Sequence, residues 1–229
     1  MTELVPGIHS VDNSIGCNTY VIIDDGITLV DTGLRGNEKN IYGCVKKLGY
    51  TPKDIKRIVV THAHLDHINC LHHLKKDSGA QVLAGETEAD YIEGRKPLEA
   101  GGGLFGLIFS LLRIYYRYKP VHVDVKLKDG DTIGVLGGSK VVLLRGHSEG
   151  NLGIYSPSHR LIFSSDTVRV LDGRPAAPNP KFTADMAGAI QAIKRLAELD
   201  FGILLPGHGK PIRDGASEKV RELYHELKH

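Results

Sequence analysis

Short apolar runs and helical patterns alternate along the first half of the chain. Residues 18–32 hold two β-branched runs around an Asp-Asp-Gly turn at residues 24–26, which predicts a β-hairpin. Over residues 37–48 the apolar positions recur at helical spacing, and Gly49 is placed to end that helix. Residues 58–60 are apolar without alternation, a pattern typical of a strand buried on both faces. Further along we expect a helix, a strand and a helix over residues 71–77, 81–84 and 87–92.

The second half of the chain carries a further series of short strands. Its apolar runs are separated by Gly, Asp, Ser and Pro, and they predict strands over residues 125–127, 132–135, 141–144, 152–155 and 161–163. A helical pattern follows over residues 183–199, then an apolar run over residues 203–205 and a charged helix from Ala216 onward. Strands with interleaved helices in both halves predict an α/β (α+β) fold in which helices cover the sheets.

Length, composition and charge narrow the class of protein. A chain of 229 residues, with 41% hydrophobic and 24% charged residues, predicts a single globular domain over residues 1–229 and argues against disorder or a membrane bundle. The net charge of +2 is too small to indicate a nucleic-acid partner. The three cysteines are widely spaced without a CxxC pair, and no signal peptide pattern precedes Ile8. We therefore expect a protein of the reducing cytoplasm.

Residues 94–121 form an unusual apolar and aromatic insertion that follows no strand pattern. Its uncharged stretch, residues 104–112, is far below the roughly 20 residues needed to span a bilayer, so we expect no transmembrane segment. One interpretation is a lid over an apolar acyl group of a small-molecule substrate, and the alternatives are a homodimer contact or packed core. The candidate substrate-binding residues are Leu104, Phe105, Ile108, Phe109 and Tyr115.

A dense cluster of metal-ligand residue types directly follows the buried strand at residues 58–60. Residues 61–67 read THAHLDH and so contain three histidines and an aspartate. In an extended segment, residues two apart point the same way, so His62, His64 and Asp66 converge while His67 points to a neighbouring position. Imidazole and carboxylate donors suit zinc, with iron or manganese as alternatives. The spacing therefore predicts two metal positions.

Three later turns expose further candidate ligands at the ends of apolar runs. The fragments GHSEGN, SSDTV and PGHG place His147, Asp166 and His208 directly after predicted strands. Strand-end loops on a rigid scaffold commonly bring ligands together from distant positions.

Five elements in order, LVDTG, HxHxDH, GHSxGN, SSD and PGHG, resemble the metallo-β-lactamase superfamily, especially its glyoxalase II-like hydrolase branch. The resemblance covers residues 18–209 and implies a four-layer αβ/βα sandwich of two mixed β-sheets with helices on the outer faces. It assigns one metal to His62, His64 and His147, a second metal to Asp66, His67 and His208, and a bridging role to Asp166. It also implies that Asp31 supports the ligand loop through hydrogen bonds.

The function implied by this resemblance is a binuclear-metal-dependent hydrolase. A hydroxide that bridges two divalent metals, zinc being expected, would attack an ester, thioester or lactone, with Asp66 as the catalytic residue that orients it and handles its proton. Two departures leave the substrate open. Only a short tail follows His208, where glyoxalase II enzymes carry a helical domain, and Arg169 stands where lactonases carry a tyrosine.

Three other function classes remain as alternatives. A single-iron persulfide dioxygenase would carry a GRTDFQ-like segment, which residues 169–180 do not resemble. The nucleases of the superfamily carry glycine where this chain has Leu65. A non-catalytic binding scaffold is disfavoured because no ligand position is missing.

Overall fold

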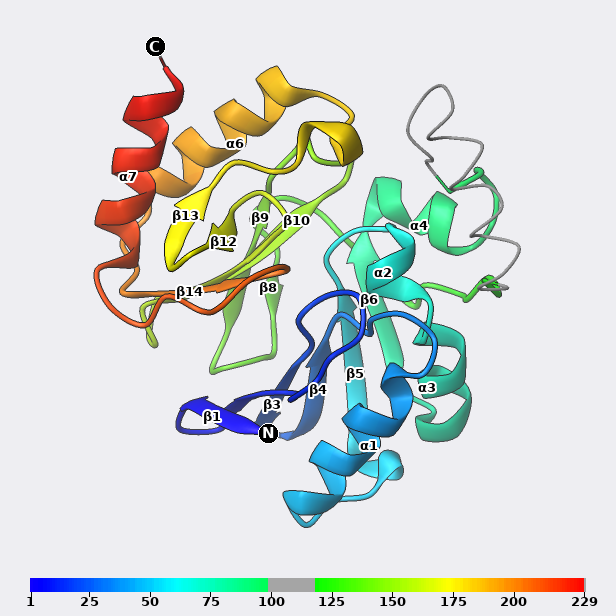
Figure 1. Cartoon of the computed structure of the whole chain (residues 1–229). Helices are drawn as coiled ribbons and strands as arrows, with labels where there is room; N and C mark the ends of the chain where they lie inside the picture. Colours follow the sequence, from blue (N-terminus) through cyan, green and yellow to red (C-terminus); the bar gives the residue numbers. More distant parts are fainter. Residues whose placement is uncertain (99–117, 229) are drawn as a thin grey trace. The chain divides into compact units, whose positions relative to one another are not determined.

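The computed structural model describes residues 1–98 and 118–228, drawn in colour in Figure 1. These residues fall into two compact units, Met1–Leu127 and Lys128–His229, and the single domain expected from length stays a prediction. In the part of the chain that is described, no helix combines the length and the apolar character required to cross a lipid bilayer.

The first unit is built on a seven-stranded mixed sheet in which the strands follow one another in chain order. Its strands are β1 (Thr2–Val5), β2 (Ile8–Ser10), β3 (Tyr20–Asp24), β4 (Gly26–Val30), β5 (Ile55–Val60), β6 (Gln81–Gly85) and β7 (Val125–Leu127). Neighbours are antiparallel from β1 to β4 and parallel from β4 to β7. The connecting helices are α1 (Asn37–Lys47), η1 (Pro52–Asp54), α2 (Leu65–Ile68), α3 (Leu71–Ser78) and α4 (Glu86–Ile92).

Helices α1, α3 and α4 pack against this sheet through the apolar stripes that the sequence pattern indicated. Ile41 of α1, Leu74 of α3 and Ile92 of α4 are fully buried in one cluster with strand residues such as Ile58 and Val82. Burying side chains of this size contributes about 1.5–3 kcal/mol each. The predicted hairpin at residues 18–32 is confirmed, because Asp24 pairs with Gly26 at its turn.

The parallel strands of the first unit deliver three segments to the same edge of the sheet. Val30 of β4 pairs with Val59 of β5, and Val60 of β5 pairs with Ala84 of β6. The chain therefore leaves β4 into Asp31, β5 into Thr61 and β6 into α4 at neighbouring positions. Residues far apart in the sequence thus meet at the carboxyl ends of these strands.

The second unit contains a five-stranded mixed sheet in the order β14-β11-β10-β9-β8 and a separate two-stranded hairpin, β12-β13. The strands are β8 (Thr132–Ile133), β9 (Ser139–Leu143), β10 (Leu152–Ser156), β11 (Leu161–Ser165), β12 (Arg169–Leu171), β13 (Arg174–Ala176) and β14 (Ile203–Pro206). The helices are η2 (Pro180–Phe182), α6 (Met186–Ala197) and α7 (Ala216–Leu227).

Helices α6 and α7 lie side by side next to the second sheet (Figure 1). Ile193 of α6 and Val220 of α7 share a buried cluster with Leu204 of β14 and Ile162 of β11. The strands and helices expected in this half are present, although β8 is shorter than predicted because the chain turns at residue 134, where Val135 N donates to Ile133 O. The pairs β1-β2 and β12-β13 were not anticipated.

Candidate metal centre

The ligand segment of the first unit changes conformation in the middle of its motif. His64 is still extended, with ψ of 145°, but its carbonyl accepts hydrogen bonds from His67 N at 2.9 Å and Ile68 N at 3.2 Å. Helix α2 therefore begins at Leu65. The assumption of an extended segment is correct only through His64, and Asp66 and His67 lie in the first turn of a helix.

This turn brings the four candidate ligands of the first unit together. The imidazole of His62 lies 4.5 Å, centroid to centroid, from that of His64 and 4.0 Å from that of His67. His67 Nε2 is 3.9 Å from Asp66 Oδ2. The first unit thus gathers three imidazoles and one carboxylate within a few ångströms.

Asp31 connects the end of β4 to this cluster. Its backbone has φ of 58°, a left-handed conformation that few residues other than glycine, asparagine and aspartate adopt. Asp31 is only 2% exposed, and its carboxylate accepts three hydrogen bonds: Oδ1 from Thr61 N at 2.8 Å, and Oδ2 from Thr61 Oγ1 at 2.8 Å and from His67 Nδ1 at 2.9 Å. Asp31 therefore fixes both ends of the ligand segment.

These contacts also fix the tautomers of two histidines. The single hydroxyl hydrogen of Thr61 is donated to Asp31, so the Thr61 oxygen accepts at its 3.1 Å contact with His62 Nδ1. His67 likewise donates from Nδ1 to Asp31. In both rings Nδ1 is engaged with the protein, so Nε2 is the nitrogen that would bind a metal.

Glu88, at the start of α4, supports the segment from another strand end. Glu88 is 1% exposed, and its Oε2 accepts a hydrogen bond of 2.7 Å from the backbone N of Ala63, the residue between His62 and His64. The sequence did not single out Glu88, because an isolated glutamate on a helix usually faces solvent. The parallel pairing of β5 with β6 brings Glu88 next to the ligand segment at residues 62–67.

Cys17 lies within 4.8 Å of the ligand atoms of Asp31 and His67 and is buried. Burial raises the pKa of the Cys17 thiol to about 11. Without a bound metal the thiol is therefore protonated at neutral pH. Cys17 is thus a further sulfur atom next to Asp31 and His67 that the sequence motifs did not single out.

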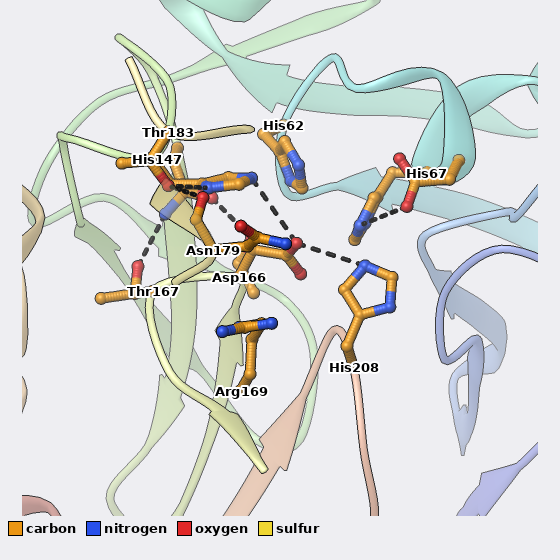
Figure 2. Close-up of polar contacts among 12 residues, drawn as sticks. His62, His67, His147, Asp166, Thr167, Arg169, Asn179, Thr183 and His208 are labelled. Atoms are coloured by element: carbon orange, nitrogen blue, oxygen red, sulfur yellow. Dashed lines mark hydrogen bonds and ion pairs between the residues drawn. The ribbon is translucent and has the colours of Figure 1, made fainter. Parts of the chain in front are cut away.

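The second unit gathers two candidate histidines around the carboxylate of Asp166, its third candidate ligand (Figure 2). Asp166 Oδ2 is 3.5 Å from His147 Nε2 and 3.2 Å from His208 Nε2. The hydroxyl of Thr183 donates to Asn179 O at 2.8 Å, so it accepts at its 3.2 Å contact with His147 Nδ1. The Nε2 atom of His147 is therefore the ring nitrogen that faces Asp166.

These distances fit a metal ion. Two donors bound at about 2.0–2.1 Å and at tetrahedral angles to one ion lie roughly 3.3 Å apart. The two nitrogen–oxygen separations around Asp166 are within a few tenths of an ångström of that value. Imidazole and carboxylate donors without a thiolate suit zinc, iron or manganese.

A buried amide holds the residues on both sides of Asp166. Asn151 is fully buried, and its Nδ2 donates to Leu144 O at 2.9 Å and to Thr167 Oγ1 at 2.8 Å. Its Oδ1 accepts from Ser165 Oγ, and Ser165 itself has a left-handed φ of 52°. One side chain thus ties the strand before His147 to the loop that carries Asp166.

Two glycines allow the close backbone approach that places the histidines of the second unit. A Cβ at Gly146 would lie 2.0 Å from Ala189 N at the start of α6, and one at Gly209 would lie 1.8 Å from Val170 O. Both glycines have positive φ, 130° and 93°. His147 and His208 therefore each sit beside a position where only glycine fits.

The candidate substrate-binding residues of the insertion, Leu104, Phe105, Ile108, Phe109 and Tyr115, lie outside the described residues. The lid, homodimer and core interpretations therefore stay predictions.

Comparison with known proteins identifies the family. The model of the metallo-beta-lactamase superfamily matches residues 13–208, which is most of the chain. The chain belongs to the metallo-beta-lactamase superfamily. Among curated relatives, Probable metallo-hydrolase YflN of Bacillus subtilis is 24% identical over 92% of this chain and 86% of its own. Hydroxyacylglutathione hydrolase of Brucella ovis is 25% identical over 59% of this chain and 44% of its own.

Solved structures of the superfamily share the fold. The metallo-beta-lactamase family protein TTHA1429 of Thermus thermophilus matches with a TM-score of 0.76 at 22% identity, over 99% of this chain and 81% of its own. The predicted metallo-β-lactamase fold is therefore confirmed, as is the superfamily. Together with the names of the relatives, membership makes the chain a metallo-hydrolase with a candidate metal site rich in histidine.

Proposed function

We propose that this protein hydrolyses a carboxylic ester or thioester of a small molecule with two divalent metal ions, zinc being preferred. His62, His64 and His147 would hold one ion, Asp66, His67 and His208 the other, and Asp166 would bridge them. The observation that carries this proposal is that His62, His67 and His147 each have Nδ1 within hydrogen-bond distance of a protein group, which leaves Nε2 as the nitrogen that would bind a metal.

When bound, the two ions would supply hydroxide at neutral pH and polarise the scissile carbonyl. The protein's part is to hold these ligands in place before substrate arrives. Asp31 and Glu88 do so for residues 61–67, through the hydrogen bonds to Thr61, His67 and Ala63. Rotation of any of these imidazoles would break a buried hydrogen bond, which disfavours other orientations.

Asp66 is the carboxylate suited to proton transfer. Its side chain is 34% exposed, whereas the Asp166 side chain is 8% exposed and lies against two imidazoles. A carboxylate that water can reach can orient an attacking water molecule and accept its proton. We assign that role to Asp66.

A thioester is the preferred bond within this class. The Brucella ovis relative is named for a hydroxyacyl derivative of glutathione, and an acyl group on glutathione is carried by sulfur. The water-derived nucleophile and the carbonyl would be the same for an ester or a lactone, so these remain substrates of the same chemistry.

A substrate panel on metal-loaded protein tests the proposal. Zinc-loaded wild type, Asp66→Ala and the exposed control Asp214→Ala would be assayed on matched thioesters, esters and lactones, with metal content measured for each. We expect Asp66→Ala to lose at least about 100-fold in kcat, as for removal of a general base. Asp214→Ala should match wild type. Full activity of Asp66→Ala would remove the role of that residue, and no hydrolysis by metal-loaded wild type would contradict the proposed reaction.

A further inference from the structure

Asn37, the first residue of α1, is fully buried, although it is neither a candidate metal ligand nor a direct partner of one. Its side-chain amide is hydrogen-bonded through both the nitrogen and the oxygen. Nδ2 donates to Thr32 O at 3.0 Å and to Thr19 Oγ1 at 3.1 Å, and Oδ1 accepts from Ile15 N at 3.0 Å. Displacing any of these partners would leave a polar group unsatisfied beside the buried amide, so Asn37 holds all three in place.

The bond from Asn37 to Thr32 leads to the backbone of a candidate metal ligand. Thr32 follows Asp31 at the exit of β4, and its N and Oγ1 both donate to His67 O, at 2.9 and 2.7 Å. By holding the carbonyl of Thr32, Asn37 restrains the residue that binds the carbonyl of His67. Gly33 permits this arrangement, because a Cβ there would lie 2.5 Å from Asn37 Nδ2.

The bond from Asn37 to Ile15 leads to the turn that carries Asp66. Ile15 is held twice, since its N donates to Asn37 and its O accepts from Leu34 N at 2.8 Å. The next residue, Gly16, approaches the ligand turn so closely that a Cβ would lie 2.8 Å from Asp66 O. Gly16 also has φ of 96°, a conformation that glycine adopts without strain. The loop that Asn37 anchors therefore packs against the first turn of α2.

We propose that Asn37 and Gly16 are positioning residues for Asp66 and His67. Asn37 fixes the loop and the exit of β4 relative to each other, and Gly16 sets how closely the loop approaches the Asp66 backbone. This inference rests on the proposed function, in which Asp66 binds a metal ion and orients the attacking water. A site of this kind requires its ligands within about 0.5 Å of the productive geometry, and such precision depends on the packing around them.

The first test perturbs the contact between the loop and the Asp66 backbone. Gly16→Ala adds a methyl group directly against Asp66 O. Its matched control is Gly49→Ala, which adds the same group to a glycine of similar φ, 86°, where the new Cβ would have no atom within 4 Å. The two variants share the backbone strain and differ in the contact with Asp66. Competition with a chromogenic chelator measures the zinc affinity of each, without a substrate.

The second test removes the anchor. Asn37→Ala deletes the hydrogen bonds to Thr32 and Ile15 together. Its control, Thr19→Val, removes one partner of the Asn37 amide in a nearly isosteric way and leaves those two bonds in place. Melting temperature shows whether each variant is folded. If Asn37→Ala does not fold, Gly16→Ala decides alone.

Gly16→Ala and Asn37→Ala should each lower zinc affinity about 10-fold, the lower end of the effect of losing a support of a metal ligand. Both controls should stay within about 2-fold of wild type. In fully zinc-loaded protein, the same two variants should lose about 10-fold in kcat with KM within about 2-fold, because a displaced Asp66 affects the reaction more than substrate binding. A merely structural role would lower the melting temperature and leave zinc affinity and kcat unchanged.

The controls also define the results that would overturn the proposal. Wild-type zinc affinity in Gly16→Ala, or equal losses in Gly16→Ala and Gly49→Ala, would show that the contact with Asp66 positions nothing. An Asn37→Ala protein that binds zinc as tightly as Thr19→Val would remove Asn37 from the assignment. If wild type hydrolyses none of the substrates, the proposed function fails, and the zinc affinities still decide whether these residues position the ligand turn.

Discussion

The two units place their candidate ligands by different physical means. In the first unit the ligands are contiguous, at residues 62–67, and two buried carboxylates, Asp31 and Glu88, hold them. In the second unit they come from three separate turns, and neutral groups hold them, chiefly the amide of Asn151 and the hydroxyl of Thr183. A carboxylate that accepts a hydrogen bond from a ligand histidine makes that histidine a stronger metal donor, but only while the carboxylate is ionised. Hydrogen bonds from neutral side chains hold a ligand mainly through their geometry.

The largest change in zinc affinity is expected from substitution of Asp31. We expect Asp31→Ala to lower zinc affinity about 100-fold, because it removes three hydrogen bonds and frees the His67 ring to rotate. Competition with a chromogenic chelator measures the affinity. Asp31→Asn is the matched variant, since asparagine tolerates the left-handed backbone and keeps one acceptor oxygen. Wild-type affinity in both variants would show that the charge of Asp31 is not needed.

The corresponding change in the second unit is Asn151→Ala, with an expected loss of about 10-fold in zinc affinity. It removes the partner of Ser165, Thr167 and Leu144 O without removing a charge. Thr167→Val tests one arm of the network and should have the smaller effect. If Asn151→Ala lowered zinc affinity as much as Asp31→Ala, the distinction between charged and neutral supports would not hold.

Glu88→Gln tests the charge of Glu88 separately from its hydrogen bond, because glutamine removes the charge and keeps an oxygen that accepts from Ala63 N. We expect about a 3-fold loss of zinc affinity from the missing charge, and a larger loss in Glu88→Ala, which also leaves the amide unsatisfied. Melting temperature serves as the control for folding. Identical zinc affinities in Glu88→Gln and Glu88→Ala would show that the hydrogen bond contributes nothing.

Alkaline pH should affect the first unit, which contains all three cysteines. Burial, followed by the hydrogen bond to Glu38, raises the pKa of Cys70 from 9.0 to about 12. Since the folded pKa lies above the unfolded value, this contribution to stability is fully present below pH 9 and is lost as the pH rises toward 12. Wild type should lose about 1 kcal/mol of unfolding free energy between pH 9 and pH 10 from this thiol.

Denaturant unfolding at pH 8 and pH 10 measures this loss, and Cys70→Ala should reduce the difference between the two pH values. Hydrogen exchange should locate the change in residues 1–98 rather than in residues 128–228. A Cys70→Ala protein with the same pH dependence as wild type would contradict the assignment.

Prediction from the sequence was most complete where one short segment contains both a secondary-structure element and the candidate metal ligands. The motif at residues 61–67 follows an apolar strand, so the position of His62 at the end of β5 could be anticipated. The hairpin β12-β13 could not, because strands of three residues that contain Arg169, Arg174 and Pro175 show no alternating apolar pattern.

The supports of the ligands were harder to predict than the ligands. Glu88 lies 25 positions from Ala63, and only the register of β6 on β5 brings the two together. Thr183 belongs to an irregular segment before α6, where a hydroxyl has no distinguishing neighbour in the sequence. The supporting role of such residues follows from the three-dimensional arrangement of the strands and loops, and the sequence around each residue carries no sign of it.

The hydrogen bond from Val170 N to His208 O has a consequence for protein engineering. Exchanging the hairpin β12-β13 is the direct way to change the side chains that follow Asp166, but the same hairpin positions the backbone of His208. A graft that alters the twist of β12 would therefore also move the backbone of a candidate metal ligand. Libraries should vary the exposed tip, residues 171–174, and keep the backbone at Val170 and Gly209 unchanged.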